Sequence, residues 1–375
     1  MSDVPPFGAE EELLLVDPAT GAPRGRAGTV RDEADGDLDG EMRTEQVETA
    51  TAPHHKADDL ADDLRRRRQE AREAARASGV EVAGLATSPV APDAGSEPGA
   101  VSEGRYGRIA ERFGAIATSQ LTSGQHVHVE VTSPEEGVGV LDRVGPWLPA
   151  LRALAANSPH WRGHDTDYAS YRSVVWSRWP SAGPTRVFGS LAAYDEAVEA
   201  MLATDTVLDD AMVYFDARLS RELGTVEVRV TDVALEIEDT VLVAVLARAL
   251  VLTAAREHRD GGPLPTAPVE ALRLAHWRAS RRGLTEALVD PRTGRPAPAA
   301  EVLDALRAHV ADALTDAGDH ERASEGLARL RADGTGAERQ RAATAGAGGD
   351  PAGAVHDAVA RFLPGSRPCE YFPAP

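Results

Sequence analysis

The 375-residue sequence has a single cysteine, Cys369, and no long hydrophobic run. One cysteine excludes an internal disulfide. A membrane-spanning helix needs about 20 mostly apolar residues in a row, and neither such a run nor a charged-then-apolar leader is present. These features predict a cytoplasmic protein that does not enter the membrane.

Lysine is almost absent as well. Lys56 is the only lysine, so the basic residues are nearly all arginine, and the net charge is −20. Nucleic acids and anionic membranes would be repelled by such a charge, so neither is expected as a partner. Any anion site in this chain has to use arginine side chains or backbone amides.

Several sequence signatures of enzymes are missing. There is no G-x-x-x-x-G-K-[ST] loop, which excludes a P-loop nucleotide enzyme. Neither C-x-x-C nor H-E-x-x-H occurs, so the usual zinc patterns are absent. A G-x-S-x-G motif is also absent, and no covalent enzyme nucleophile is indicated.

Strands with one ionisable face and one apolar face are the most informative feature that is present. TSGQHVHVEV (122–131) alternates two histidines and a glutamate with valines, and GTVEVRV (224–230) alternates polar residues with valines. Residues two apart share one face of a strand. In GAEEELLLV (8–16), Glu10 and Glu12 therefore share a face and Glu11 lies on the other. EMRTEQVETAT (41–51) carries three further glutamates.

A single strand of this kind is common where one face of an antiparallel sheet is exposed to solvent. Several of them on one face would bring carboxylates close together, where they repel and raise each other's pKa. A divalent cation removes that repulsion, and carboxylate oxygens with an occasional imidazole suit Mg²⁺ or Mn²⁺. Such ions act in nucleotide phosphate chemistry, which is the interpretation that the strands favour.

The same strands indicate the fold class. Strands of a doubly wound parallel sheet are covered on both faces and read as continuous apolar runs, unlike these. We therefore expect an α+β fold with an antiparallel sheet, helices behind it and an open front. Helices are predicted at 57–77, 105–119, 139–158, 190–204, 239–258, 267–282 and 300–314.

One domain is expected to span residues 1–375. Its core sheet and helices would occupy about 7–260, with a helical C-terminal part at about 265–330 and 351–363. Helix 239–258 is apolar nearly all round and is expected to lie buried on the sheet. We expect a solvated helix face for the RRRR run at 65–68, a loop at 88–104, and a mobile lid or linker at about 331–350.

Five separate motifs resemble those of one known family. They are GAEEELLLVDPATG, EQVETATAP, SGQHVHVEV, DTDYASYRSVVWSRWP and GTVEVRVTDVAL. In this order they resemble the carboxylate–amine ligases of the glutamate–cysteine ligase type 2 family, over roughly residues 7–260. Any one motif alone would be weak, but five in order are specific.

The resemblance implies a fold, a reaction and cofactors. The fold is similar to that of glutamine synthetase: an antiparallel sheet curved into a funnel, with helices packed on its outer face. The implied reaction uses ATP and Mg²⁺ or Mn²⁺. A substrate carboxylate attacks the γ-phosphate, and an amine captures the acyl phosphate to give an amide, ADP and phosphate. In the best-known case, glutamate's γ-carboxylate is joined to cysteine, and a homodimer is expected.

The resemblance also implies roles for individual residues. Glu227 and Arg229 would act in catalysis, with Arg229 close to phosphate, while Arg172 and Arg178 would bind nucleotide phosphate or a substrate carboxylate. The implied metal ligands are Glu10, Glu12, Glu41, Glu48, His126 and Glu227.

Structural explanations stay open for some of these residues and their neighbours. Arg172 and Arg178 could pair with surface acids, and His128 could merely support its strand. Two residues depart from the family pattern: Glu130 stands where a glycine is common, and Gln125 where an apolar residue or cysteine is usual. Both belong to the site strand, so the amine substrate is left open.

Two other functions are compatible with the residues. H-x-H with a distant glutamate could form an iron site of two histidines and one carboxylate, although acids exceed imidazoles here. A non-catalytic relative that binds a nucleotide or an amino acid would keep the same acids. Mg·ATP would raise the melting temperature of the ligase and of the binder alike, so only product formation separates them.

Overall fold

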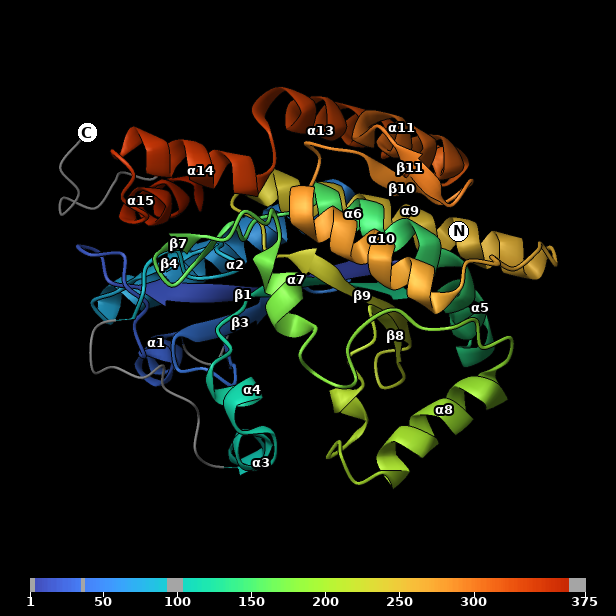
Figure 1. Cartoon of the computed structure of the whole chain (residues 1–375), viewed down its shortest axis with the longest axis horizontal. Coiled ribbons are helices and arrows are strands. Elements are labelled where there is room, and N and C mark those ends of the chain that lie inside the picture. The colour runs from blue at the N-terminus through green and yellow to red at the C-terminus, as the bar shows by residue number, and fades with distance from the viewer. Residues whose placement is uncertain (1–3, 35–37, 93–103, 364–375) are drawn as a thin grey trace.

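The computed structural model describes residues 4–34, 38–92 and 104–363 (Figure 1). Cys369 and most of the predicted loop 88–104 lie outside these ranges. A seven-stranded sheet forms the centre, in the order β2-β3-β1-β5-β9-β8, with β4 also paired to β1. Every pairing in it is antiparallel. The strands are β1 (Phe7–Val16), β2 (Asp39–Gly40), β3 (Gln46–Ala50), β4 (Glu81–Ala83), β5 (Gly124–Glu130), β8 (Ala217–Ser220) and β9 (Thr225–Asp232).

The alternating pattern gives the sheet one apolar face. Leu13 and Leu15 of β1, Val127 of β5, and Val226 and Val228 of β9 are fully buried in the main hydrophobic core. The residues between them project to the opposite face, as the period of two requires. The prediction of an antiparallel sheet with one polar face is confirmed.

Helices cover the apolar face in layers (Figure 1). The 23-residue helix α9 (Ile237–Arg259) lies against β1 and β5, and its residues 241–247 are all buried, which confirms the predicted buried helix. Other helices pack around it. They are α2 (Ala57–Ala77), α5 (Pro134–Val144), α6 (Leu148–Leu154), α10 (Val269–Arg282), α11 (Ala299–His309), α12 (Ala311–Ala317) and α13 (His320–Asp333).

A smaller set of helices lies on the other side of the sheet (Figure 1). It comprises α3 (Gly104–Phe113) and α4 (Ala115–Thr118), while α7 (Tyr171–Trp176) lies at the level of the sheet. Helix α8 (Leu191–Ala203) contacts α5, and its Tyr194 joins the main core. Ile109 of α3 and Met42 join Trp179 and Met212 in a separate small core, with Tyr106, Trp176 and Tyr214 packed against it. The polar face of the sheet therefore looks toward an aromatic cluster.

The remaining elements are short or C-terminal. Two small hairpins pair β6 with β7 and β10 with β11. The bounds are α1 (Ala27–Glu33), β6 (His160–Trp161), β7 (His164–Asp165), η1 (Gly145–Trp147), η2 (Asp210–Met212), β10 (Leu288–Asp290), β11 (Arg295–Ala297), α14 (Gly336–Gly346) and α15 (Ala352–Arg361). In the described parts of the chain, none of these or the preceding helices is long and apolar enough to cross a membrane.

The RRRR run is not the solvated face that was expected. Arg65 and Arg66 are exposed, but Arg68 is fully buried and binds Glu11 through two hydrogen bonds of 2.9 and 2.6 Å. Residue 68 follows Leu64 by four positions and so lies on the same core-facing stripe of α2. Helical periodicity places this arginine inside, and Glu11, on the face of β1 opposite to Glu10 and Glu12, neutralises it.

Several predicted boundaries also differ. Helix 105–119 is divided at Gly114, whose φ of +51° suits glycine. Helix 139–158 begins earlier, at Pro134, and tightens into the 3₁₀ turn η1 at Gly145–Trp147. Most of 331–350, expected to be a mobile lid or linker, belongs to helix α14, which a capping box between Thr335 and Glu338 begins. Whether this segment moves stays a prediction.

Candidate active site

Strand register brings the ionisable residues together. Glu12 of β1 lies opposite Glu48 of β3, and Glu10 lies opposite His126 of β5. On the next strand pair, His128 lies opposite Glu227 of β9. Opposed residues on one face of an antiparallel pair have Cβ atoms about 4.5–5.5 Å apart. Three neighbouring strand pairs thus place a continuous ionisable cluster on the polar face.

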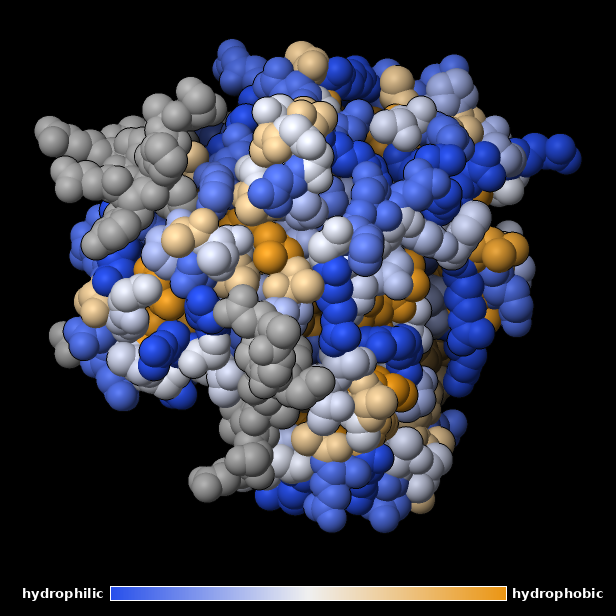
Figure 2. All heavy atoms as spheres, turned by 60° about the vertical axis from the view of Figure 1, so that its left-hand side comes forward, coloured by the Kyte–Doolittle hydropathy of each residue, from blue (hydrophilic) through white to orange (hydrophobic). Residues whose placement is uncertain are grey.

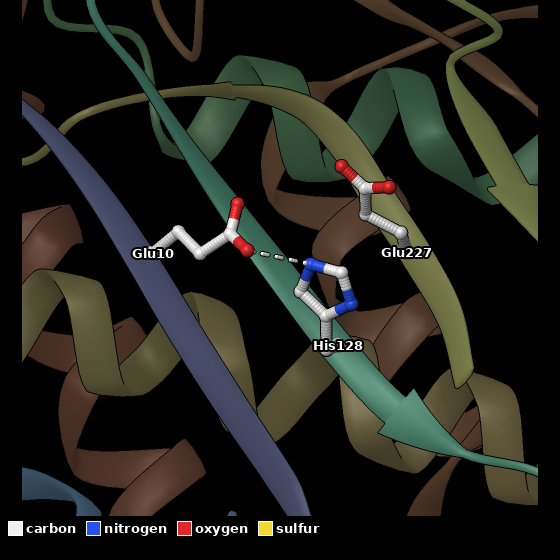
Figure 3. Close-up of side chains that lie close together, drawn as sticks. All are labelled: Glu10, His128 and Glu227. Carbon is white, nitrogen blue, oxygen red and sulfur yellow. Dashed lines mark ion pairs between the residues drawn. The ribbon is translucent and has the colours of Figure 1, made fainter. Parts of the chain in front are cut away.

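Glu10, His128 and Glu227 form the first carboxylate group (Figure 3). One ligand atom from each residue lies within 4.8 Å of the others. His128 Nε2 is 3.1 Å from Glu10 Oε1, and its Nδ1 is 2.9 Å from the hydroxyl of Thr225. The side chains come from three adjacent strands and meet on one side of the sheet (Figure 3).

Glu12, Glu41 and Glu48 form the second carboxylate group, again with one oxygen from each within 4.8 Å of the others. Glu41 comes from the turn before β3, whereas the other two lie on strands. The backbone N–H of Gly124 donates a 2.6 Å hydrogen bond to Glu12 Oε2 and fixes that carboxylate. This group contains no imidazole and offers only hard oxygen donors.

His126 lies between the two groups. Its Nδ1 is 3.1 Å from Glu10 Oε2, and its Nε2 is 3.7 Å from Glu12 Oε1. The ring is almost fully buried, and Nε2 has no hydrogen-bond partner among the described residues. Burial and the charge of Arg229 lower the pKa of His126, so the ring is neutral.

The two groups differ in charge state. Burial would raise the pKa of Glu10, but hydrogen bonds from His126 and His128 outweigh it and hold this pKa well below its usual range. Burial likewise opposes ionisation of Glu227, yet the charges of Arg229 and Arg218 lower its pKa to about 2. The two carboxylates of the first group are therefore ionised at neutral pH.

The second carboxylate group behaves in the opposite way. Burial, together with the neighbouring charge of Glu41, raises the pKa of Glu12 and raises that of Glu48 well above its ordinary value. Crowded buried carboxylates without a cation retain protons. A divalent ion would replace those protons with a charge that all three oxygens can share, so the donor set fits Mg²⁺ or Mn²⁺.

Arginines border the first group. Arg229 pairs with Glu227 Oε1, and Arg218 Nε lies 2.6 Å from Glu227 Oε2. The Arg229 guanidinium also lies over the rings of Trp176 and Tyr214 at 6.0 and 5.9 Å. Two fixed cations thus stand beside the carboxylates, where they could hold a transferring anionic group.

These side chains line one cavity of about 390 Å³, which we call the acidic cavity. Its floor is the polar face of the sheet. Its other walls come from the small aromatic core and from the segments around α3 and β8. Those walls include Arg105, Tyr106, Trp176, Trp179, Tyr214 and Leu223.

All six predicted metal ligands and Arg229 line the acidic cavity. Arg172 and Arg178 are not among its described lining residues. Arg172 is buried beside β5, where a Cβ on Gly124 would come within 2.1 Å of its Nη2. Arg178 is exposed and donates to Ser119 Oγ at 3.0 Å. The binding roles given to these two arginines stay predictions.

Some residues of the acidic cavity were given too small a role from the sequence or were missed. His128, considered a supporting residue, belongs to the first carboxylate group. Arg218 was not singled out, although it alternates with Ala217 and Leu219 in β8 and could have been found by the same period of two. Arg105 and Tyr106 carry no comparable pattern.

The two departures from the family pattern do not reach the acidic cavity. Glu130 is exposed at the end of β5 and is not among the described lining residues. Gln125 is buried on the opposite face of β5, where its Nε2 donates to the carbonyl of Thr240 at 3.0 Å. The doubt that they raised about the amine substrate therefore has no support in the geometry.

Comparison with protein families identifies the same family that the five sequence motifs resemble. The model of glutamate–cysteine ligase family 2 (GCS2) matches residues 6–361. A Streptomyces coelicolor protein that carries the provisional name glutamate–cysteine ligase 2 is 50% identical over 342 residues, which cover 89% of this chain and 93% of that protein. A Nocardia farcinica protein provisionally named glutamate–cysteine ligase 2-1 is 44% identical over 370 residues, with coverage of 98% and 95%.

Solved structures share the fold at low sequence identity. The glutamate–cysteine ligase of Francisella tularensis, solved in complex with AMP, superposes with a TM-score of 0.70 at 13% identity, covering 97% of this chain and 90% of that chain. A bifunctional glutathione synthetase from Pasteurella multocida gives a TM-score of 0.66 at 17% identity, covering 96% and 52%. These likenesses confirm the predicted fold.

Proposed function

Because this chain belongs to the glutamate–cysteine ligase family 2 and is thus a ligase that forms carbon–nitrogen bonds, we propose that it uses ATP and Mg²⁺ to join a carboxylate to an amine. The proposed substrates are glutamate, through its γ-carboxylate, and an amine such as cysteine. The observation that carries this proposal is the pair of carboxylate groups in one arginine-bordered cavity. The AMP complex of the Francisella tularensis ligase supports a nucleotide as co-substrate.

Two sets of side chains would hold divalent ions. Glu12, Glu41 and Glu48 supply one set, and Glu10, His128 and Glu227 the other. Ions held there would supply positive charge against the negative charge that develops during phosphoryl transfer. His126 would hold Glu10 in place through its Nδ1, and its role as a metal ligand stays a prediction.

The proposed reaction has two steps. An oxygen of the substrate carboxylate attacks the γ-phosphorus of ATP, which forms the acyl phosphate and releases ADP. The neutral amine then attacks the acyl carbon, phosphate leaves with the C–O bonding electrons, and the amine loses a proton to give the amide. Neither step needs a covalent enzyme nucleophile.

The protein's own groups would act by position and charge. Arg229 and Arg218 are held by Glu227 at the edge of the acidic cavity and would stabilise the transferring phosphoryl group. Trp176 and Tyr214 pack beside Arg229 and shield it from water, which strengthens its electrostatic effect. Glu227 is therefore proposed to act twice, as a metal ligand and as the anchor of these arginines.

The test is ATP-dependent product formation. Purified chain with glutamate, cysteine, ATP and Mg²⁺ should release ADP and form an amide that mass spectrometry identifies. Glu227→Gln should lower turnover by about 100-fold or more, since it removes a charge at the centre of the site. Glu130→Gln is the matched control, because Glu130 is exposed on the neighbouring strand outside the acidic cavity.

The same experiment limits the alternatives. Full activity in Glu227→Gln would contradict the proposed role of Glu227. Nucleotide binding without product from any pair of acid and amine would instead support a non-catalytic protein that binds the nucleotide. The iron enzyme is disfavoured, because its site would need two histidines and one carboxylate. The first carboxylate group has one histidine and two carboxylates, and the second group has no histidine. The homodimer and the cytoplasmic location stay predictions.

A further inference from the structure

An anionic substrate that approaches this chain meets an unfavourable charge. Acids outnumber basic residues by 60 to 40, and hydrophilic residues cover most of the face shown in Figure 2. The acidic cavity itself has six glutamates among its described lining residues. Substrates such as glutamate and ATP are themselves anions, so their binding needs positive charge that faces the cavity. In a chain almost without lysine, an arginine open to the cavity is the side chain that meets this need.

Four arginines are among the described residues that line the acidic cavity, and they differ in accessibility. The side chain of Arg43 is buried, with 1% of its surface exposed. Arg229 and Arg218, with side chains 9% and 19% exposed, are held by Glu227 inside the cavity. The side chain of Arg105 is 34% exposed, which is the highest value of the four. A ligand in the cavity therefore reaches Arg105 most readily.

Arg105 belongs to α3, on the side of the sheet that carries the polar face (Figure 1). Its guanidinium forms a bidentate ion pair with Asp209: Nε donates to Oδ2 at 2.9 Å, and Nη2 donates to Oδ1 at 2.7 Å. Asp209 is not among the described lining residues of the acidic cavity, and 38% of its side chain is exposed. Arg105 thus borders the cavity while its present partner lies outside it.

The ion pair between Arg105 and Asp209 is one that can be exchanged. An ion pair that water reaches on both sides contributes little net free energy, because water solvates each partner nearly as well. If Arg105 leaves, Asp209 stays accessible to water and does not become a buried unpaired charge. The fork of a guanidinium binds any carboxylate in the same bidentate geometry. A ligand carboxylate in the acidic cavity can therefore take the place of Asp209.

We propose that Arg105 binds the carboxylate of the acid substrate that does not react, and that Asp209 holds the guanidinium until this substrate arrives. This role rests on the proposed ligase function, in which the acid is glutamate and its γ-carboxylate reacts. The α-carboxylate would then pair with Arg105, whereas Arg218 and Arg229 remain with Glu227 for the transferring phosphoryl group. Arg105 would thus select acids that carry a second carboxylate.

Arg112 provides a matched control on the same helix. Its Nη1 donates to the backbone carbonyl of Asp205 at 2.6 Å and to the carboxylate of the same residue at 3.3 Å. Its side chain is 33% exposed, almost the same as that of Arg105, but it is not among the described lining residues of the acidic cavity. Both arginines tie α3 to residues 205–209. A merely structural role would give both the same effect, whereas substrate binding involves Arg105 alone.

Binding is measured first, by calorimetry of L-glutamate added to the full chain with Mg²⁺ and without nucleotide. The second probe is 4-aminobutyrate, which is glutamate without its α-carboxylate, and the parent chain should bind it about tenfold more weakly than glutamate. Arg105→Gln should weaken glutamate binding about tenfold and leave 4-aminobutyrate unchanged. Arg112→Gln should bind both probes like the parent chain. Asp209→Asn removes the competing carboxylate and should tighten glutamate binding by up to about fivefold.

Turnover then separates the acid from the nucleotide. In Arg105→Gln the KM for glutamate should rise about tenfold, while the KM for ATP stays at the value of the parent chain. A rise in the KM for ATP instead would assign Arg105 to a phosphate and overturn the proposal. Equal glutamate binding by Arg105→Gln and the parent chain would overturn it as well, and so would an equal loss in Arg112→Gln.

The role of Arg105 and the ligase function can fail separately. If no product forms from any acid and amine, but glutamate binding still depends on Arg105, the ligase function is wrong and the binding role stands. If product forms with an unchanged KM for glutamate in Arg105→Gln, the ligase function stands and the binding role is wrong. A parent chain that does not bind glutamate also overturns the binding role.

Discussion

Metal binding to the second carboxylate group should release protons. Glu12 and Glu48 have raised pKa values because they are buried and face Glu41, whereas hydrogen bonds and arginine charges lower the pKa values of Glu10 and Glu227. Mg²⁺ therefore has to displace protons from Glu12 and Glu48, but not from Glu10 and Glu227. Each displaced proton makes the association constant rise about tenfold per pH unit.

The size of the effect follows from which carboxyl retains its proton. The pKa of Glu48 is raised more than that of Glu12, so Glu48 should contribute up to about one proton per chain at pH values below its raised pKa, with Glu12 adding the remainder. The released protons are measured by calorimetry of Mg²⁺ binding in two buffers with different ionisation enthalpies. Glu48→Gln should reduce the release, and Glu227→Gln should not.

The same shifts set the pH dependence of stability without metal. A carboxyl whose pKa is raised in the folded state binds more protons there than in the unfolded state. Its contribution to the free energy of unfolding is therefore present at low pH. It is lost as pH rises from the unfolded pKa through the folded one. The metal-free chain should thus become less stable above about pH 4.5 through Glu48, and Mg²⁺ should restore stability. An absence of proton release at every pH above the ordinary carboxyl pKa of 4.5 would refute this account of the group.

Two further changes test packing. Arg68→Met leaves the Glu11 carboxylate buried without its partner and should lower the free energy of unfolding by about 3–5 kcal/mol in urea titrations, whereas Arg65→Met on the exposed face should cost less than about 1 kcal/mol. Equal losses would contradict the placement of Arg68. Gly124→Ala forces Arg172 aside and should cost about 1–3 kcal/mol; an unchanged urea midpoint would show that the space beside β5 is wider than described.

The face on which each ionisable residue lies could be predicted because alternation in a strand is local. Glu10 and Glu12 share a face whatever β1 pairs with, and so do Glu227 and Arg229 in β9. The partners across strands could not be predicted in this way. That Glu12 meets Glu48 depends on register between segments more than thirty residues apart, and only the family resemblance suggested it.

The placement of some arginines could not be predicted from composition or motif alone. The RRRR run reads as polar in composition, but one of its four positions falls on the buried stripe of α2, and only the helical period reveals it. Arg172 was expected at an anion site because arginine in a motif suggests binding. It lies buried beside Gly124 of β5, and its binding role stays a prediction.

The position of His126 has a consequence for the order in which the proposed divalent ions would bind. A neutral imidazole carries a single N–H, and its two nitrogens here face Glu10 and Glu12. A hydrogen on one nitrogen leaves the other as a lone-pair acceptor, so the ring can serve only one side as donor at a time. A cation that arrives on one side therefore selects the tautomer seen by the other. The two positions should fill in sequence, with the second affinity dependent on the first.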